Sequence, residues 1–140
     1  MRLRSRSGFS LIEMIVVITI ITMLLGGSAL GYGRYQKNAR DTRRRSDLEQ
    51  IRAALELFRS NTINGNYPNT APWELFIAPY FGNVANIPKD PLGQSYTYTA
   101  KPDGCINDGI HPYCTSYNLS ATLELKGTCT VDPNKPASAC

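Results

Sequence analysis

An apolar run near the N-terminus carries a single acidic side chain. From Phe9 to Leu25 the sequence reads FSLIEMIVVITIITMLL, and Glu13 is its one charged residue. A run of about twenty apolar residues is long enough to span a bilayer as a helix, whereas a charge at the bilayer centre costs roughly 2.5–3.5 kcal/mol. The run therefore predicts a membrane-spanning helix in which Glu13 either lies near the interface or has a partner inside the membrane.

Charge is spread unevenly over the 140 residues, which have a formal net charge of +4. Three arginines (Arg2, Arg4 and Arg6) precede the apolar run, and residues 34–60 hold eight basic and four acidic side chains. The remainder of the chain is mildly acidic, with four lysines against six acids. Basic residues beside a membrane segment favour contact with phospholipid headgroups over a nucleic-acid groove.

All four cysteines, Cys105, Cys114, Cys129 and Cys140, lie in the last quarter of the chain. An even number of cysteines behind a membrane-targeting segment predicts an oxidising compartment and two disulfides. Of the three possible pairings we favour Cys105–Cys114 and Cys129–Cys140, because each closes a short loop. The spacings do not supply a zinc knuckle.

The flanks of the apolar run conflict with the cysteines. Six basic residues follow the run and three precede it, so the positive-inside rule alone places the C-terminal side in the cytoplasm, where disulfides are rare. A cleaved secretory signal is an alternative, but no clean small-x-small site ends the run. The small residues of GGSALGYG keep that alternative open.

The stretch SGFSLIEMIVVITIITMLL resembles the class III signal of type IV pilins and type II secretion pseudopilins. The family pattern is a basic leader, a glycine, a Phe or Met, and an apolar helix with a glutamate four residues further on, here Gly8, Phe9 and Glu13. The resemblance implies that a prepilin peptidase cuts between Gly8 and Phe9 and that the new Phe9 terminus is N-methylated. It also implies a single-pass subunit of the cytoplasmic (inner) membrane whose C-terminal body lies outside the cytoplasm, in agreement with the cysteines.

The same resemblance implies a role for Glu13 in assembly. Cleavage leaves a cationic amine on Phe9, and Glu13 of one subunit can pair with the Phe9 amine of its neighbour in a helical filament. Such pairing offsets part of the desolvation of both charges. The alternative is a Glu13 that snorkels to the interface or is protonated in the monomer. Implied partners are further copies of the chain, prepilin peptidase, an inner-membrane assembly platform, minor pilins and membrane lipid.

A second resemblance, to major pseudopilins, covers the body. The segments IRAALELFRSNTINGNYPNT and IPKDPLGQSYTYT depart from the family at Leu92 and Ser95. They match at Asn64-Gly65, Tyr67-Pro68, Asp90-Pro91, Gly93, Tyr96 and Tyr98.

The resemblance implies an α+β, pilin-like fold: a long N-terminal helix, membrane-spanning and then amphipathic, packed on a small antiparallel sheet with a disulfide-stapled C-terminal region. The expected parts are a cleaved leader at 1–8, a transmembrane or filament-core helix at 9–33, and an extracytoplasmic domain at 34–140 that includes an amphipathic helix at 34–60.

The spacing of apolar residues supports these elements. Leu48, Ile51, Leu55 and Phe58 share one face of the first helix with Ala54. The charge run DTRRRSDLEQ on its other side is interpreted as a solvated face, or else as a contact with headgroups or with acids of a neighbouring subunit. Four glycines in the middle of the helix (Gly26, Gly27, Gly31 and Gly33) indicate either close helix packing or, by resemblance, local unwinding in a filament.

Further along the chain, WELFIAPYFGN predicts a short helix whose Trp73, Phe76, Ile77 and Phe81 cover the sheet edge. QSYTYTA alternates and predicts a strand. SYNLSATLEL predicts a second strand with apolar residues at every odd position from 117 to 125. A third, short strand is expected at 128–131.

The loop with the sequence DGCINDG carries oxygen ligands. Asp103, Asn107 and Asp108 are calcium candidates because major pseudopilins have a calcium site in this general region, but their spacing does not fit an EF-hand, and turn formation is the favoured interpretation. No catalytic constellation accompanies His111, so no enzyme activity and no cofactor are expected.

The function predicted from these features is a structural subunit of a type II secretion pseudopilus or a type IV pilus, supporting protein secretion. The alternative is a type IV pilin of a surface pilus for adhesion, motility or DNA uptake. DNA binding would rest on Arg43, Arg44 and Arg45 and is less favoured, because a filament would crowd that part of the helix.

Overall fold

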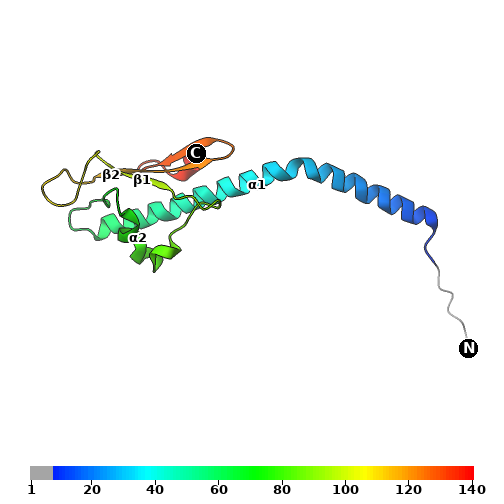
Figure 1. Cartoon of the computed structure of the whole chain (residues 1–140), viewed down its shortest axis with the longest axis horizontal. Coiled ribbons are helices and arrows are strands. Elements are labelled where there is room, and N and C mark those ends of the chain that lie inside the picture. Colours follow the sequence, from blue (N-terminus) through cyan, green and yellow to red (C-terminus); the bar gives the residue numbers. More distant parts are fainter. Residues whose placement is uncertain (1–7) are drawn as a thin grey trace, which may run out of the picture. The chain divides into compact units, whose positions relative to one another are not determined.

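The computed structural model describes residues 8–140, and for residues 27–31 it describes the backbone but not the side-chain surroundings. The predicted leader arginines lie outside the described residues. The chain divides into two compact units, residues 1–36 and 37–140. Figure 1 shows the order of the elements, which are α1 (Leu11–Asn61), α2 (Trp73–Phe81), a 3-10 turn (Val84–Asn86), β1 (Thr97–Lys101), β2 (Ser116–Leu123), β3 (Gly127–Val131) and a second 3-10 turn (Ala137–Ala139).

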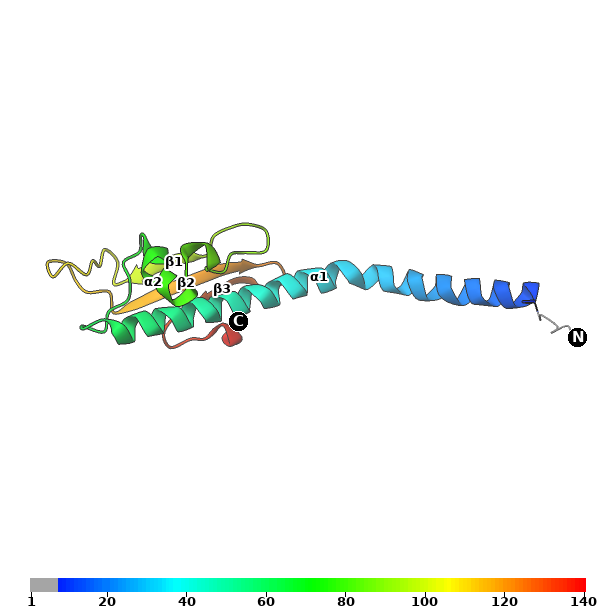
Figure 2. The ribbon, with the colours of Figure 1, turned by 90° about the horizontal axis from the view of Figure 1, so that it is seen from below.

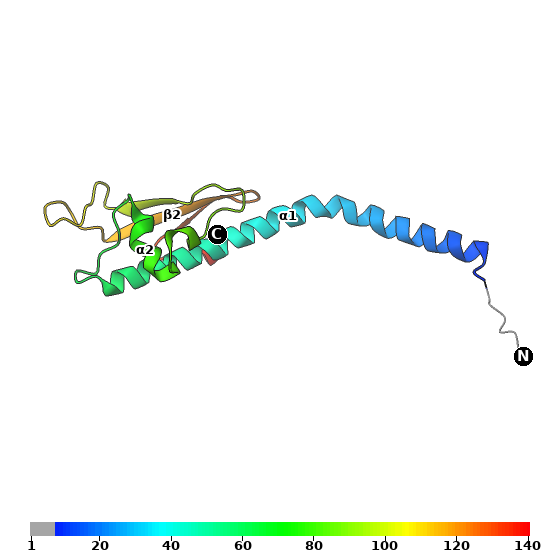
Figure 3. The same ribbon diagram turned by 60° about the horizontal axis from the view of Figure 1, so that its bottom comes forward.

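The second unit is an antiparallel sheet of order β1-β2-β3 packed on the last part of α1. Tyr98, Leu119 and Val131 lie opposite one another across the three strands and are all buried. Side chains alternate along each strand, so the residues between them face away from the core. The strands run beside this part of α1 in Figures 1 and 3. The predicted α+β architecture is confirmed.

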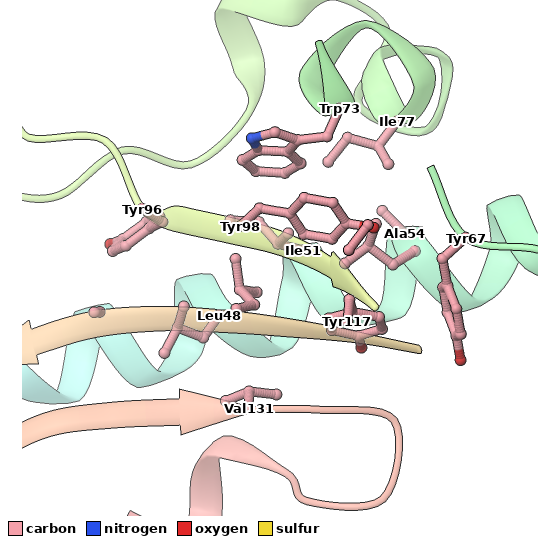
Figure 4. Close-up of a cluster of buried hydrophobic side chains, with 14 of the residues drawn as sticks. Leu48, Ile51, Ala54, Tyr67, Trp73, Ile77, Tyr96, Tyr98, Tyr117 and Val131 are labelled. Atoms are coloured by element: carbon pink, nitrogen blue, oxygen red, sulfur yellow. The ribbon is translucent and has the colours of Figure 1, made fainter. Parts of the chain in front are cut away.

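The core between α1 and the sheet contains both aliphatic and aromatic side chains. The α1 face predicted from the spacing is buried at Leu48, Ile51, Ala54 and Leu55. Trp73 of α2 stacks on Tyr98 at 5.1 Å, and Tyr98 stacks on Tyr117 at 5.7 Å. Tyr67 then meets Tyr117 edge-on at 4.8 Å, as Figure 4 shows. This aromatic series joins α2, the sheet and the loop after α1 into one core.

Two expectations about apolar residues are wrong in detail. Phe76 is 39% exposed and meets Phe58 of α1 edge-on, rather than covering the sheet. Leu125 is 43% exposed, because strand pairing ends at Leu123 and the following residues form the turn to β3. Periodicity placed Phe76 correctly on its helix but extended the second strand two residues too far, to Leu125.

Buried tyrosines tie distant segments together through their hydroxyl groups. Tyr96 donates to the Asp47 carboxylate of α1 at 2.7 Å, and Tyr98 donates to the Pro68 carbonyl at 2.8 Å. Tyr67 donates to Glu56 at 2.8 Å. The rings supply core volume, and these three hydroxyl groups each hold a second segment, so they set the spacing between α1, the loops and β1. The buried Tyr117 hydroxyl group has no hydrogen-bond partner among the described residues.

An ion cluster, formed by Asp41, Arg44, Asp90 and Glu124, lies where α1, the loop before β1 and the β2–β3 turn meet. The Arg44 guanidinium donates through two nitrogens to Asp90, and also to Asp41 at 2.9 Å and Glu124 at 3.2 Å. Arg44 is only 3% exposed and Asp41 1%. The interpretation of DTRRRSDLEQ as a solvated face is therefore wrong for Asp41, Arg44 and Asp47, which are buried.

Backbone groups complete the ion cluster. The Asp41 carboxylate accepts the N–H groups of Glu124 and Leu125 at 2.8 and 3.0 Å, so α1 caps the β2–β3 turn. Asp90 accepts the N–H of Leu92, which closes the turn that the DPLG sequence begins. Asp41 and Asp90 thus each have both a cationic and a backbone donor, which offsets the cost of burying their charges.

The pKa values of the cluster reflect these contacts. The hydrogen bond from Arg44 lowers the pKa of Asp90 despite burial, and the bond to Asp90 raises the pKa of Arg44. Burial raises the pKa of Asp41, but hydrogen bonds from the Glu124 and Leu125 backbone and from Arg44 outweigh it and leave the pKa lowered. The hydrogen bond from Arg40 lowers the pKa of Glu124 to about 2.

Both disulfides follow the pairing favoured from the sequence. Cys105 pairs with Cys114 across the loop between β1 and β2, and Cys129 of β3 pairs with Cys140. The first bond closes the β1–β2 loop. The second holds the segment after β3 close to the sheet.

Polar contacts also attach the segment after β3 to α1. The Arg52 guanidinium donates to the Pro133 carbonyl at 3.4 Å, and the Glu49 carboxylate accepts the Ala137 N–H. In Figure 2 this segment passes along α1 on the side away from β1. The last part of α1 is therefore covered on two sides.

Replacing Arg44 by alanine is expected to destabilise the domain by about 3–5 kcal/mol, because Asp41 and Asp90 remain buried without their cation. Chemical denaturation of the full chain in detergent measures this loss. Arg43→Ala is the matched control, since Arg43 is exposed and makes no ion pair among the described residues. Equal stability of the two variants would contradict the role given to the ion cluster.

Acid is expected to unfold the domain through the same carboxylates. Their pKa values are lowered in the folded chain, so their stabilisation is complete above about pH 4.5 and is lost as the pH falls toward about 2. The Glu124→Gln variant should show a shallower fall in unfolding temperature across this window than the parent chain. Asp132→Asn serves as the control, and an unchanged slope in Glu124→Gln would refute the assignment.

Candidate assembly site at the start of the long helix

The predicted cleavage site lies in exposed, non-helical backbone. Gly8, Phe9 and Ser10 precede the helix, and Phe9 is 80% exposed. The Ser10 carbonyl accepts the Met14 N–H at 3.3 Å, which makes Ser10 the residue that caps α1. The bond between Gly8 and Phe9 therefore lies one residue outside the first helical hydrogen bond, between two exposed residues.

Glu13 occupies the third position of the helix and folds back on the cap. Its Oε2 atom accepts the Ser10 N–H at 3.1 Å. A serine followed three residues later by a glutamate is the sequence pattern of a capping box, in which the carboxylate satisfies a backbone N–H left free at the helix start. The helix dipole also stabilises a negative charge at this position.

This geometry places the carboxylate close to the predicted new terminus. After cleavage Ser10 would be the second residue of the chain, so the Glu13 carboxylate would lie one residue from the Phe9 amine. The hydrogen bond from the Ser10 N–H to Glu13 was not predicted from the sequence. The S-x-x-E pattern of residues 10–13 was the signal that could have shown it.

The described part of α1 in the first unit exposes its apolar side chains. Their exposed fractions range from 48% at Val16 to 83% at Met23. The hydroxyls of Thr19 and Thr22 donate to backbone carbonyls one turn back, at 2.8 and 2.9 Å, so neither leaves a free polar group on this surface. A continuous exposed apolar surface of this kind marks an interaction site for protein or lipid.

Among the residues that the structure describes, no helix meets the length and apolarity required to cross a membrane. The predicted membrane span at 9–33 therefore stays a prediction.

The helix is continuous through its glycine-rich middle. No other segment of the chain lies within 4 Å of the position that a Cβ atom would take at Gly26 or Gly33. The surroundings of Gly27 and Gly31 are not among those that the structure describes. Neither close packing nor unwinding at these glycines is tested in a single chain.

The three calcium candidates make other contacts. Lys101 donates to Asp103 at 2.6 Å, and the Asn107 side chain donates to the Tyr67 carbonyl at 2.7 Å. Asp108 faces His111 at 2.7 Å, and the backbone N–H groups of His111 and Ile110 lower the pKa of Asp108 to about 2. Within the described range, no group of three metal-binding side chains comes together. Calcium binding by these residues stays an untested prediction.

The three arginines proposed for DNA differ in their surroundings. Arg43 is exposed, Arg44 is buried in the ion cluster and Arg45 is partly buried. A phosphate backbone needs exposed cations. The buried Arg44 cannot serve there without breaking the ion cluster, so the geometry gives this alternative little support.

Comparisons with known proteins identify the family of the chain. A family model described as the prokaryotic N-terminal methylation motif matches residues 3–29. The type II secretion system core protein G of Pseudomonas aeruginosa is 30% identical over 112 residues, covering 71% of this chain and 78% of that protein. No solved structure matches the chain.

The matched motif contains the exposed Phe9 and the capping Glu13, and the similarity to core protein G extends well into the globular domain. Family similarity and fold thus agree on a pilin-like structural subunit, in a family of structural rather than catalytic proteins. The chain belongs to the type IV pilin and type II secretion major pseudopilin family.

Proposed function

We propose that this protein is the main structural subunit of a type II secretion pseudopilus. Its precursor is cut between Gly8 and Phe9 and methylated at Phe9 by a prepilin peptidase, and waits as a single-pass protein of the inner membrane with its domain outside the cytoplasm. It then polymerises through the apolar part of α1. The observation that carries the proposal is the accessible Gly8–Phe9 bond one turn from the Glu13 carboxylate, and the similarity to core protein G supports it.

Assembly uses the carboxylate in two ways. In the uncut chain Glu13 accepts the Ser10 N–H. In the filament it turns to the Phe9 amine of a neighbouring subunit, where the pair offsets the desolvation of both charges. Glu13 therefore sets the axial register between neighbouring subunits. The exposed apolar residues around it supply the free energy of packing. Assembly platform, minor pilins and membrane lipid are the accessory partners.

A surface type IV pilus is the second candidate function. The two disulfides favour it, because they protect a domain exposed to the medium. Deletion of the gene separates the two candidates. Loss of extracellular protein secretion with unchanged surface filaments supports the pseudopilus, whereas loss of surface filaments with normal secretion supports the pilus.

Mass spectrometry of protein made together with its prepilin peptidase tests the processing step. The mature chain is expected to begin at N-methyl-Phe9, and Gly8→Ala should abolish cleavage, because the peptidase reads the residue before the cut. A mature chain that begins after residue 30 would show an ordinary signal peptide and end the filament proposal.

Replacing Glu13 by glutamine separates its two uses. Glutamine still accepts the Ser10 N–H in a capping box but carries no charge for the Phe9 amine. The variant should be cut and methylated normally yet yield at least about tenfold fewer filaments by electron microscopy, a coupling of about 1.4 kcal/mol or more per contact. Filaments as abundant as those of the parent chain would mean that Glu13 acts only as a helix cap.

A further inference from the structure

Two tyrosines and an arginine lie where the exposed apolar part of α1 ends. Tyr32 and Tyr35 are 63% and 72% exposed, and Arg34 is exposed between them in the sequence. With the described residues, none of the three side chains forms a hydrogen bond or an ion pair. These three residues are therefore free to bind a partner outside the chain.

The three side chains point in different directions around the helix. Successive residues of an α-helix are rotated by about 100° around its axis. Tyr32 and Tyr35 are therefore neighbours on one side of α1, whereas Arg34 lies on another side. Together they form a belt that is spread around the helix, rather than a single stripe of the kind that one partner helix covers. A belt of this form suits a surrounding layer of headgroups.

The belt lies one bilayer thickness from the start of α1. Tyr32 follows Leu11 by 21 residues, which corresponds to roughly 32 Å of helix, and the hydrocarbon core of a bilayer is about 30 Å thick. Between Leu11 and Gln36 the two tyrosines are the only aromatic residues, and Glu13 and Arg34 are the only charged ones. Tyrosine rings are enriched at the membrane–water interface, and a long arginine side chain reaches the headgroups from there.

The charge of the belt selects the class of lipid. Of the basic residues that follow the apolar run, Arg40 and Arg44 are ion-paired within the globular domain. Arg34 has no such pair among the described residues, and the one acid of its unit, Glu13, is 21 residues away. A lipid with a net negative charge neutralises this cation, whereas a zwitterionic lipid brings a cation of its own.

We infer that the belt binds anionic phospholipid headgroups of the leaflet that faces away from the cytoplasm. The Arg34 guanidinium donates to a lipid phosphate, and the two tyrosine rings lie at headgroup level with their hydroxyl groups toward the polar side. The inference rests on the proposed function, because it requires the apolar part of α1 to lie in a membrane before assembly. It adds the class of lipid and the residues that fix the depth of the helix.

Quenching of tryptophan fluorescence by brominated lipids locates the belt in vesicles that contain the full chain. Trp73 is the only tryptophan, and Trp73→Phe removes it while keeping an aromatic ring over Tyr98. Tyr32→Trp in this background then reports from the belt. Bromine near the headgroup should quench it at least about twofold more than bromine at the end of the acyl chain. Ile21→Trp, eleven residues earlier in the apolar run, is the control and should show the opposite order.

The same Tyr32→Trp chain measures which lipid is preferred. Vesicles contain equal amounts of phosphatidylglycerol and phosphatidylcholine, and only one of the two lipids carries bromine near its headgroup in each sample. The two degrees of quenching should show a preference of about fivefold for phosphatidylglycerol. Adding Arg34→Gln should bring the two lipids to nearly equal quenching. Arg43→Gln removes the same charge from an exposed arginine outside the belt, and should keep the preference.

Failure of the inference is distinguishable from failure of the proposed function. A tryptophan at position 32 that neither lipid quenches lies in water or against protein, and would overturn the inference alone. An equal loss of preference in Arg34→Gln and Arg43→Gln would do the same, because it shows a general effect of charge. If the full chain does not enter the vesicles, the proposed membrane-bound precursor fails and the inference with it. Expected quenching in a chain that never forms filaments in cells would end the filament proposal and leave the belt in place.

Discussion

The globular domain depends on one buried guanidinium. Arg44 joins α1 to the loop before β1 through Asp90 and, through Asp41 and Glu124, to the β2–β3 turn. Desolvating four charged groups is costly unless each has its partners, and here carboxylates and backbone donors supply them together. The ion cluster fixes the position of the sheet along the axis of α1. The tyrosine hydroxyl groups and the aromatic series then set the distance between the sheet and α1.

The two units of the chain have opposite needs. The domain has a buried apolar core of its own, and the buried charges of its ion cluster have partners within it. The first part of α1 exposes nearly every apolar side chain that the structure describes. Its one acid, Glu13, has a neighbouring backbone N–H as its only partner within residues 8–140. Lipid or protein must cover such a surface, and in the proposed filament other copies of the chain do so.

Much of the fold could be predicted from local sequence. The 3.6-residue spacing of Leu48, Ile51 and Leu55 gave the buried face of α1, and alternation gave β2, because both periods are set by backbone geometry. Motif residues gain a reason from the structure: Gly65 and Gly93 have positive φ in turns, and Asp90 meets Arg44. The exposure of Phe76 and Leu125 could not be predicted, because burial depends on where a neighbouring element ends.

Residues close together in the chain account for the long helix, the Gly8–Phe9 junction and the lone acid at Glu13. The packing of distant segments instead determines which member of a charge run is buried and which tyrosine hydroxyl groups reach a second segment. Arg43 and Arg44 are adjacent and chemically identical, yet one is solvated and the other holds three segments together. That difference comes from partners some 46 and 80 residues away, whose meeting is a property of the packed core rather than of any local pattern.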